Sequence, residues 1–498
     1  MSLFKRIPFF CFFLSLAIIS YSQDRLNQKL DCYSIIVGKN ASTDGSVIIA
    51  HNEDTGGDRV VNYFKVPNIH HQPNEKITFM NGGSLEQSGT SNAYLWINLP
   101  GSKVCDSYVN EYGVAICSDG CPSREKNPDL ADGGILFWLR RIMAERAKSA
   151  REGVKIAGKL IDKYGYADSG RTYLIADANE GWMVAVVNGK HWIAVRIPDD
   201  EVAVIPNYYT IGKINLSDTV NFAGSPDIVE YAMEQGWYKP DTDGEFHFAK
   251  AYSDPGSLNH PGNISRMWGG VNLASGRNYA MDENLPFSFK PENKLGHKEV
   301  MNILRDHYVG TKLDLSENYT LGSPYECNKT TICSQTTQYS FVAQLRNWMP
   351  KSISARIWIA TFRPDAQAYL PWYVCIDDTP EFHKHTTYDS AIENQFNPSN
   401  SAYDQTLKHI YWMNKRVAEN VNRDYKNMLP LVRETWDANE EHTLSKIVDL
   451  ENKALKIYEK NPKRAEKLLS DFSKKAARKA YGKTEVLIKI TAEKDHDD

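Results

Sequence analysis

The N-terminal part of the chain contains the sequence CYSIIVGKNASTDGSVIIAHNED at residues 32–54. Two apolar runs, Tyr33–Val37 and Val47–Ala50, have the β-branched composition that is typical of strands. The segment Asn40–Ser46 between them is polar and contains a glycine, as expected of a turn. This stretch therefore predicts a β-hairpin that begins at Cys32.

Antiparallel pairing brings the two ends of this hairpin together. In such a pair the sum of partner positions is constant, so a loop centred on Thr43 places Cys32 opposite Asp54. His51 lies three residues earlier in the same polar cluster, His-Asn-Glu-Asp. We therefore expect a thiol, an imidazole and carboxylates to meet at one end of the hairpin.

This combination is suited to nucleophilic catalysis. A cysteine attacks as its thiolate and needs a base or a cationic neighbour to form one. If the chain is cut before Cys32, the new α-amine, with an ordinary pKa of about 7.7–8.0, can act as that base. Asp54 would hold the amine, and His51 would lie beside the sulfur. The alternative is a half-cystine on an edge strand beside a solvated acidic turn, and spacing alone leaves both open.

The first residues resemble an export signal. Lys5 and Arg6 precede an apolar run from Ile7 to Ile19, and small residues follow up to Ser22. The run is shorter than the ~20 residues that span a bilayer, which disfavours a retained anchor. We predict a signal peptide at residues 1–22 and a propeptide at 23–31, and hence an exported protein, periplasmic or secreted, with no stable membrane insertion after signal removal.

Composition excludes some partners and leaves others open. The 498 residues carry a formal net charge of -4, so no basic surface for nucleic acid is expected.

The chain has eight cysteines, of which Cys11 lies in the signal. In an oxidising compartment six others could form disulfides, but the sequence does not give the pairing. These six are Cys105, Cys117, Cys121, Cys327, Cys333 and Cys375. Cys117 and Cys121 lack a matching His or Cys pair, so no metal site is predicted.

The rest of the chain predicts mixed secondary structure. Residues 172–207 contain four β-type runs separated by short turns, which predicts an antiparallel meander. Apolar residues at helical spacing predict two helices within residues 135–161, and a strand pair is expected within residues 356–376. From about residue 400 the composition favours helices. We predict an α+β hydrolase domain at residues 32–399 and a helical C-terminal region at 400–498.

Several blocks of the chain, in order, resemble one family. The first is the hairpin stretch quoted above, and the others occur between residues 109 and 373. The chain is similar in these blocks to the dipeptidase A-type cysteine peptidases, which are N-terminal-nucleophile hydrolases related to secernin, penicillin V acylase and bile-salt hydrolase. The later blocks are VNEYGVA at 109–115, VAVIPN at 202–207, NISRMW at 263–268, ICSQTTQ at 332–338, FVAQLR at 341–346, IWIA at 357–360 and PWY at 371–373.

The resemblance implies roles for individual residues. Cys32 resembles the family's nucleophile, exposed by propeptide removal, with self-cleavage at the Asp31–Cys32 bond. Asp54 resembles the carboxylate that binds the nucleophile's amine. Asn207 resembles the side chain that donates to the oxyanion, a role suited to a neutral amide held at a strand end. Arg266 resembles the arginine near the sulfur and the substrate carbonyl.

One position departs from the related acylases, which carry arginine where this chain has His51. An imidazole supplies charge only when it is protonated, so a role for His51 beside the thiolate and a role in packing both remain open. The second oxyanion donor in relatives is a backbone amide, which corresponds to a position near Ser118 or Asp119. Tyr112 and Asp119 are pocket candidates, although ordinary loop structure is favoured for both.

The resemblance implies a four-layer αββα sandwich and a cysteine dipeptidase that acts through a thioester on Cys32, with no metal or organic cofactor. The same fold hosts several amide hydrolyses, so an acylase of N-acyl amides of bile-salt or penicillin type is an alternative. A non-catalytic exported binding protein on the same scaffold is a second. The expected partner is a small peptide substrate, and a homo-oligomer is left open.

Overall fold

The computed structural model describes residues 32–56, 59–314, 323–326 and 330–493. The predicted signal peptide at 1–22, the predicted propeptide at 23–31 and Cys327 lie outside the described residues.

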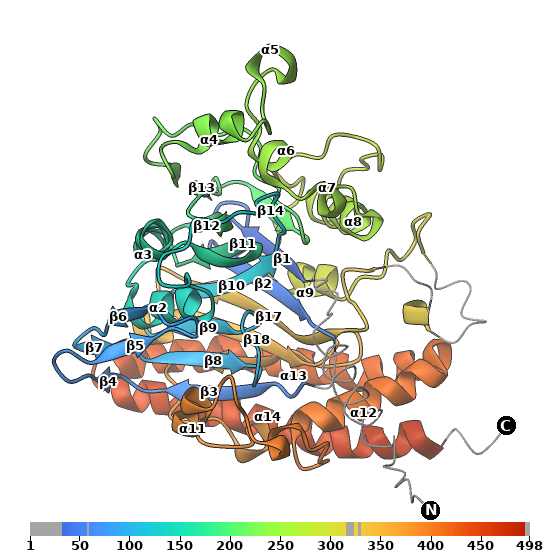
Figure 1. Cartoon of the computed structure of the whole chain (residues 1–498). Helices are drawn as coiled ribbons and strands as arrows, with labels where there is room; N and C mark the ends of the chain where they lie inside the picture. The colour runs from blue at the N-terminus through green and yellow to red at the C-terminus, as the bar shows by residue number, and fades with distance from the viewer. Residues whose placement is uncertain (1–31, 57–58, 315–322, 327–329, 494–498) are drawn as a thin grey trace, which may run out of the picture.

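Two large antiparallel sheets form the body of the molecule (Figure 1). The seven-stranded sheet runs in the order β16 (Ser288–Phe289), β14 (Val202–Ile205), β1 (Tyr33–Val37), β2 (Val47–Asp54), β17 (Thr337–Leu345), β18 (Ala355–Thr361) and β19 (Leu370–Tyr373). The eight-stranded sheet runs in the order β15 (Phe222–Gly224), β13 (Trp192–Arg196), β12 (Gly181–Gly189), β11 (Tyr166–Ala176), β10 (Ala115–Gly120), β9 (Ser107–Asn110), β8 (Tyr94–Asn98) and β3 (Asn62–Val66). Two small ribbons pair β4 (Ile69–His70) with β7 (Thr90–Ser91) and β5 (Lys76–Thr78) with β6 (Ser84–Glu86).

The two large sheets bury side chains against each other. Alternate residues of a strand point to opposite faces of its sheet. On one face, Ile36 and Ile49 of the seven-stranded sheet share an apolar cluster with Leu174 and Met183 of the eight-stranded sheet. Both large sheets are therefore buried on their facing sides, and the core lies between them.

Helices cover the other face of each sheet. On the eight-stranded sheet, α2 (Phe137–Arg146) and α3 (Ala150–Tyr164) pack Ile142 and Ile161 against Val184. On the seven-stranded sheet, α8 (Pro261–Ser275) packs on β14, and α9 (His297–Leu304) packs on β2 and β17. Strands and helices of this kind confirm the predicted α+β class.

Shorter helices and the C-terminal helices complete the chain. The short ones are α4 (Ile228–Glu234), α5 (Pro240–Asp243), α6 (Phe248–Tyr252), α7 (Pro255–Leu258), α10 (Lys351–Ser354), α11 (Tyr388–Glu393) and the 3-10 turns η2 (Pro324–Glu326), η3 (Glu381–His383) and η4 (Asn400–Tyr403). Near the C-terminus, α12 (Ile410–Arg423), α13 (Tyr425–Tyr458) and α14 (Pro462–Glu493) run beneath the sheets in Figure 1. Among the described residues, no helix is both long and apolar enough to cross a membrane.

The prediction of a four-stranded meander within residues 172–207 is wrong in its last strand. β11, β12 and β13 pair in sequence in the eight-stranded sheet, whereas β14 pairs with β1 in the other sheet. The chain changes sheets at the Pro198-Asp-Asp-Glu turn. A strand has the same local pattern in either sheet, so its sequence does not reveal which partner it joins. This crossover brings the end of β14 beside the start of β1.

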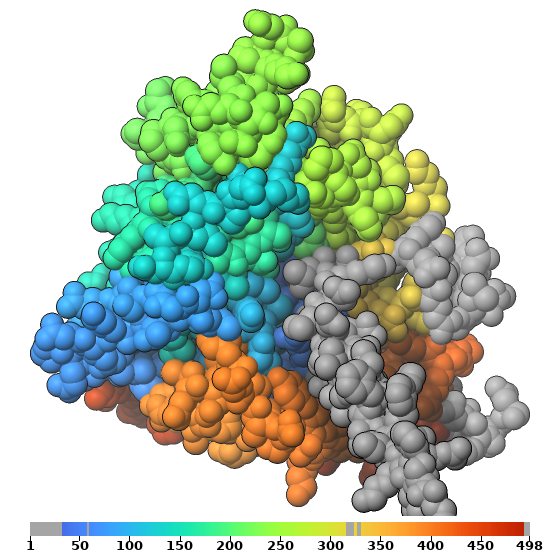
Figure 2. All heavy atoms as spheres, viewed as in Figure 1, coloured from blue at the N-terminus to red at the C-terminus, as the bar shows by residue number. Residues whose placement is uncertain are grey.

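The segment that follows β19 wraps around the edge of the eight-stranded sheet. In the space-filling view the orange segment that contains α11 lies against the blue surface of the strands near residues 62–98 (Figure 2). The Asn98 amide donates to Gln395 Oε1 at 2.7 Å, and the rings of Phe137 and Phe396 meet edge to face. The chain therefore remains packed on the sheets as it approaches the C-terminal helices.

A buried charge cluster joins α13 to the seven-stranded sheet. The carboxylate of Glu451 accepts from Arg346 at 2.7 Å, Arg356 at 3.1 Å and the Tyr373 hydroxyl at 2.5 Å. Both arginines are largely buried, and they lower the pKa of Glu451 against the opposing effect of burial.

We expect Glu451→Ala to lower the free energy of unfolding by about 3–5 kcal/mol, because it leaves buried arginines without their counter-charge. Urea unfolding of the purified protein measures this loss. Asp449→Ala, an exposed position on the same helix, is the matched control. Equal stability of the two variants would show that α13 is not anchored through this cluster.

Candidate active site

Cys32 lies between two neighbouring strands of the seven-stranded sheet. In the β1–β2 pair, Ser34 faces His51, and in the β1–β14 pair Ser34 faces Ile205. Extending both registers by two residues puts Cys32 opposite Glu53 on one side and Asn207 on the other. Cys32 is buried, with 1% of its surface exposed.

The predicted pairing of Cys32 with Asp54 is therefore offset by one residue. The turn is asymmetric, because Asp44 accepts hydrogen bonds from the Ser46 backbone and hydroxyl, and Gly45 has a φ of 84°. The sulfur donates to Glu53 Oε1 at 3.5 Å and to the Asp54 carbonyl oxygen at 3.6 Å. Glu53 thus holds the position expected of Asp54, while Asp54 remains buried next to the cysteine.

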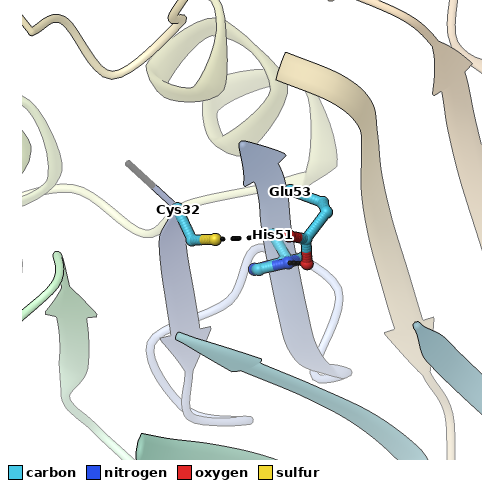
Figure 3. A group of neighbouring side chains, drawn as sticks. All are labelled: Cys32, His51 and Glu53. Carbon is cyan, nitrogen blue, oxygen red and sulfur yellow. Dashed lines mark hydrogen bonds and ion pairs between the residues drawn. The ribbon is translucent and has the colours of Figure 1, made fainter. Parts of the chain in front are cut away.

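A chain of buried hydrogen bonds continues from Glu53 to Asp119 of the other large sheet, and Figure 3 shows its first members, Cys32, Glu53 and His51. Glu53 Oε2 lies 3.1 Å from His51 Nε2, and His51 Nδ1 lies 2.7 Å from Ser34 Oγ. Ser34 in turn donates to Asp119 Oδ2 at 2.6 Å. A hydroxyl has a single hydrogen, so with Asp119 ionised Ser34 accepts from His51, and Nδ1 carries a proton. This leaves His51 Nε2 to face Glu53.

The electrostatics of this cluster are those of an acidic pocket. Burial raises the pKa of the Cys32 thiol well above its ordinary value, and the neighbouring carboxylates of Glu53, Asp119 and Asp54 raise it further. Burial also raises the pKa of Asp119 to about 7, against the lowering effect of His51 and of the Ser34 hydrogen bond. In the uncut chain the thiol is therefore neutral.

Arg266 and Asn207 lie on the other side of Cys32. Arg266, from α8, donates to the Cys32 carbonyl oxygen at 2.7 Å and to Asn207 Oδ1 at 3.1 Å. The Asn207 amide donates to the Gly120 carbonyl oxygen at 3.0 Å. One guanidinium therefore links the cysteine backbone to the asparagine side chain and fixes which end of the amide faces β10.

The sequence of α8 permits this close approach. A Cβ at Gly270 would lie 1.5 Å from the hydroxyl oxygen of Tyr33, so only glycine lets the helix pack this tightly on β1. The N-terminal turn is capped by His260, whose ring accepts from the Gly262 amide. Asn263 then accepts from Arg266 at 2.6 Å and aligns the guanidinium.

A bulge in β17 borders the site. Thr337 pairs with Asp54 and Tyr339 with Glu53, which leaves Gln338 as the extra residue. Gln338 donates to the Thr55 carbonyl oxygen at 2.6 Å and accepts from the hydroxyl of Tyr411 on α12. The C-terminal helices therefore contact a residue next to the acidic cluster.

The structure brings together all five residues predicted for the site, namely Cys32, His51, Asp54, Asn207 and Arg266. Sequence reasoning missed Ser34 and Glu53, although Glu53 stood in the polar cluster of the hairpin. Asp119 was noted, but ordinary loop structure was favoured for it, and that expectation is wrong because Asp119 lies in β10. Tyr112 lies in the turn between β9 and β10, with its ring near the amines of Lys148 and Lys351.

The described cysteines outside the site are free thiols, namely Cys105, Cys117, Cys121, Cys333 and Cys375. Among the described residues, two buried groups have ligand atoms spaced closely enough for a metal ion: Cys32, His51 and Glu53, and a second group of His307, Cys333 and Asp365. Both groups are already joined by hydrogen bonds, and in the second the Asp365 carboxylate accepts from Tyr325 and Tyr425 and pairs with Arg363. The expectation of a metal-independent site stays a prediction.

Comparison with known proteins finds relatives named as probable dipeptidases. A probable dipeptidase of Latilactobacillus sakei is 28% identical over 410 residues, which cover 79% of this chain and 81% of that protein. A probable dipeptidase of Salmonella dublin is 29% identical over 363 residues, covering 70% and 82%. A solved structure, a variant of conjugated bile acid hydrolase from Clostridium perfringens, is 12% identical and covers 66% of this chain and 89% of that one, with a TM-score of 0.27 that is too low to establish a common fold.

A family model also matches most of this chain. The sequence model of peptidase family C69 matches residues 31–113 and 127–438, which include the hairpin, Asn207, Arg266 and the β17 bulge. The resemblance inferred from the ordered motifs is confirmed, and the chain belongs to peptidase family C69.

Proposed function

We propose that this protein is an exported cysteine dipeptidase whose nucleophile is Cys32, made N-terminal by removal of residues 1–31. One observation supports this most directly: Cys32 is held between Glu53 and Asn207, with Arg266 bound to its carbonyl oxygen. The relatives named probable dipeptidases favour a peptide substrate.

The proposed reaction uses the amine that cleavage creates. The free α-amine of Cys32 takes the thiol proton, and the thiolate attacks the carbonyl carbon of the substrate amide. The amine then protonates the leaving nitrogen, and water hydrolyses the thioester. A positive charge on this amine balances the acidic pocket, which otherwise holds the thiol neutral. Asp54 is the proposed partner of the amine.

Asn207 is the proposed side-chain donor to the oxyanion. An amide nitrogen carries two hydrogens, and one of them is donated to the Gly120 carbonyl oxygen. The second is proposed to stabilise the oxyanion, with the amide orientation fixed by Arg266. A backbone amide near Ser118 or Asp119 is the proposed second donor.

We further infer that the two facing sheets and their covering helices form the four-layer αββα sandwich of N-terminal-nucleophile hydrolases. The facing apolar clusters and the helices on both outer faces support this assignment. The domain limits at residues 32–399 and 400–498 are part of the same proposal.

Substrate profiling tests the proposed activity. Mature protein starting at Cys32 is expected to hydrolyse unblocked dipeptides and to leave N-acyl amino acids and bile-salt conjugates intact, and liquid chromatography of the products measures both. Activity confined to N-acyl amides would favour the acylase alternative. N-terminal sequencing of protein recovered after export is the companion measurement, since a stable mature end at Gln23 or Asp24 would contradict the catalytic proposal.

A further inference from the structure

The first cut cannot use the base that serves the mature enzyme. Before cleavage, the Cys32 nitrogen belongs to the peptide bond with Asp31, and an amide nitrogen does not accept a proton at neutral pH. The α-amine exists only after that bond is broken. If the chain releases its own propeptide, another group must therefore take the thiol proton in the uncut chain.

Glu53 occupies the position required of this group. The single hydrogen of the Cys32 thiol has two acceptors within reach, Glu53 Oε1 at 3.5 Å and the Asp54 carbonyl oxygen at 3.6 Å. Of these two, only the carboxylate is basic enough to hold a proton. Glu53 is 1% exposed, so bulk water does not compete for this contact.

His51 lies on the far side of Glu53 and gives the carboxylate a fixed orientation. Because Nδ1 donates to Ser34, which donates to Asp119, the ring is locked and Nε2 points at Glu53 Oε2. Without a hydrogen between them, His51 Nε2 and Glu53 Oε2 would point lone pairs at each other across 3.1 Å. One hydrogen therefore lies between these two atoms. With that hydrogen on Nε2, His51 is an imidazolium and Glu53 Oε1 remains open to the thiol proton.

We propose that Glu53 is the general base for removal of the propeptide, with His51, Ser34 and Asp119 as its positioning residues. This proposal rests on the proposed function, because it assumes that Cys32 attacks the bond that precedes it. The proposal gives a function to the hydrogen-bonded side chains of His51, Ser34 and Asp119. The reaction proposed above for the mature enzyme does not use these side chains.

The proposed cleavage begins with a proton transfer from the thiol to Glu53 Oε1, and the sulfur forms a bond to the Asp31 carbonyl carbon. The carbon–nitrogen bond breaks, and the Cys32 nitrogen receives the proton back from Glu53 and becomes the free amine. Water then hydrolyses the thioester, which gives the carboxyl group of Asp31 and restores the Cys32 thiol.

The charged groups around His51 favour Glu53 as the general base and His51 as the residue that positions it. The imidazolium is flanked by Glu53 and by Asp119, whose Oδ1 lies 3.9 Å from Nδ1. Tyr339 on β17 meets the His51 ring edge to face, and Cys117 on β10 lies 4.0 Å from Ser34 Oγ. A protonated His51 would place its positive charge between two carboxylates and beside the sulfur, where it would compensate the negative charge of the thiolate.

The test compares cleavage of the precursor with hydrolysis by the mature enzyme. Purified full-length Glu53→Gln is expected to lose its propeptide about 10²–10⁴-fold more slowly than the native chain, the usual contribution of a general base. Intact mass spectrometry over time measures this rate. The same substitution is then made in a chain released directly at Cys32 from a cleavable fusion partner. There, dipeptide hydrolysis is expected to fall by a smaller factor than propeptide removal, because the α-amine supplies the acid–base catalysis.

Two further variants separate chemistry from structure. Glu53→Asp keeps a carboxylate and is expected to recover part of the cleavage rate, and Glu86→Gln, at an exposed site on β6, is the matched control. Normal cleavage by Glu53→Gln would overturn the proposal, and so would equal losses in cleavage and hydrolysis. A native precursor that is never cut without an added protease also overturns it, while activity of the fusion-released chain would leave the proposed function standing.

Discussion

Cys32→Ala is expected to abolish hydrolysis of every substrate and to leave the propeptide attached. Both reactions are proposed to use the same sulfur, and alanine offers no atom that can form the thioester. The substitution removes one buried atom from a position already packed between β2 and β14, so the fold should persist. Product analysis on dipeptides and intact mass of the purified chain measure the two losses.

The control for this variant is another free thiol away from the cluster. Cys375 follows β19, and its thiol donates to the Glu466 carbonyl oxygen on α14. Cys375→Ala should therefore keep both activities. A Cys32→Ala protein that still appears with residue 32 at its N-terminus would count against self-cleavage, and one that still hydrolyses dipeptides would remove Cys32 from the mechanism altogether.

Asn207→Ala in the mature chain is expected to lower kcat by about 10²–10³-fold, the loss typical of one oxyanion donor. KM should change much less, because the interaction strengthens only as negative charge develops on the substrate oxygen. Steady-state kinetics on one dipeptide separate the two parameters. The fold should tolerate the change, since Asn207 follows β14 rather than standing within its ladder.

Asn259→Ala is the matched control, because this exposed asparagine donates only locally to the Pro255 carbonyl oxygen. A near-normal kcat for Asn207→Ala would exclude the oxyanion role. A proportionate rise in KM with unchanged kcat would instead assign Asn207 to substrate binding.

Local pattern predicted several strands and helices but not the partners of those strands. The positions of β11, β12 and β13 follow from β-type runs and short turns, and that of α3 follows from apolar residues at helical spacing. Nothing local distinguishes β14, which joins a strand more than a hundred residues earlier in the chain. Pairing of this kind is decided by the packing of whole sheets.

The contacts of the candidate site could likewise be predicted only in part. Hairpin geometry correctly predicted that Cys32 meets the polar cluster of β2, yet the asymmetry of the turn exchanged the positions of Glu53 and Asp54. Asp119 could not be found in this way, because it belongs to the other large sheet, and hairpin geometry says nothing of which residues that sheet brings to Ser34 and His51. Arg266 and Asn207 were available only through family resemblance, since their contacts depend on α8 and the crossover of β14.

The place of β1 within its sheet has a consequence for the cleavage product. Chain ends are usually poorly ordered, because nothing holds the first residues in place. Here the end proposed at Cys32 leads directly into a strand that is hydrogen-bonded on both sides, by β2 and by β14, and Arg266 holds its first carbonyl group. The proposed cleavage would therefore not release a fraying terminus but would expose one that the sheet already holds in register.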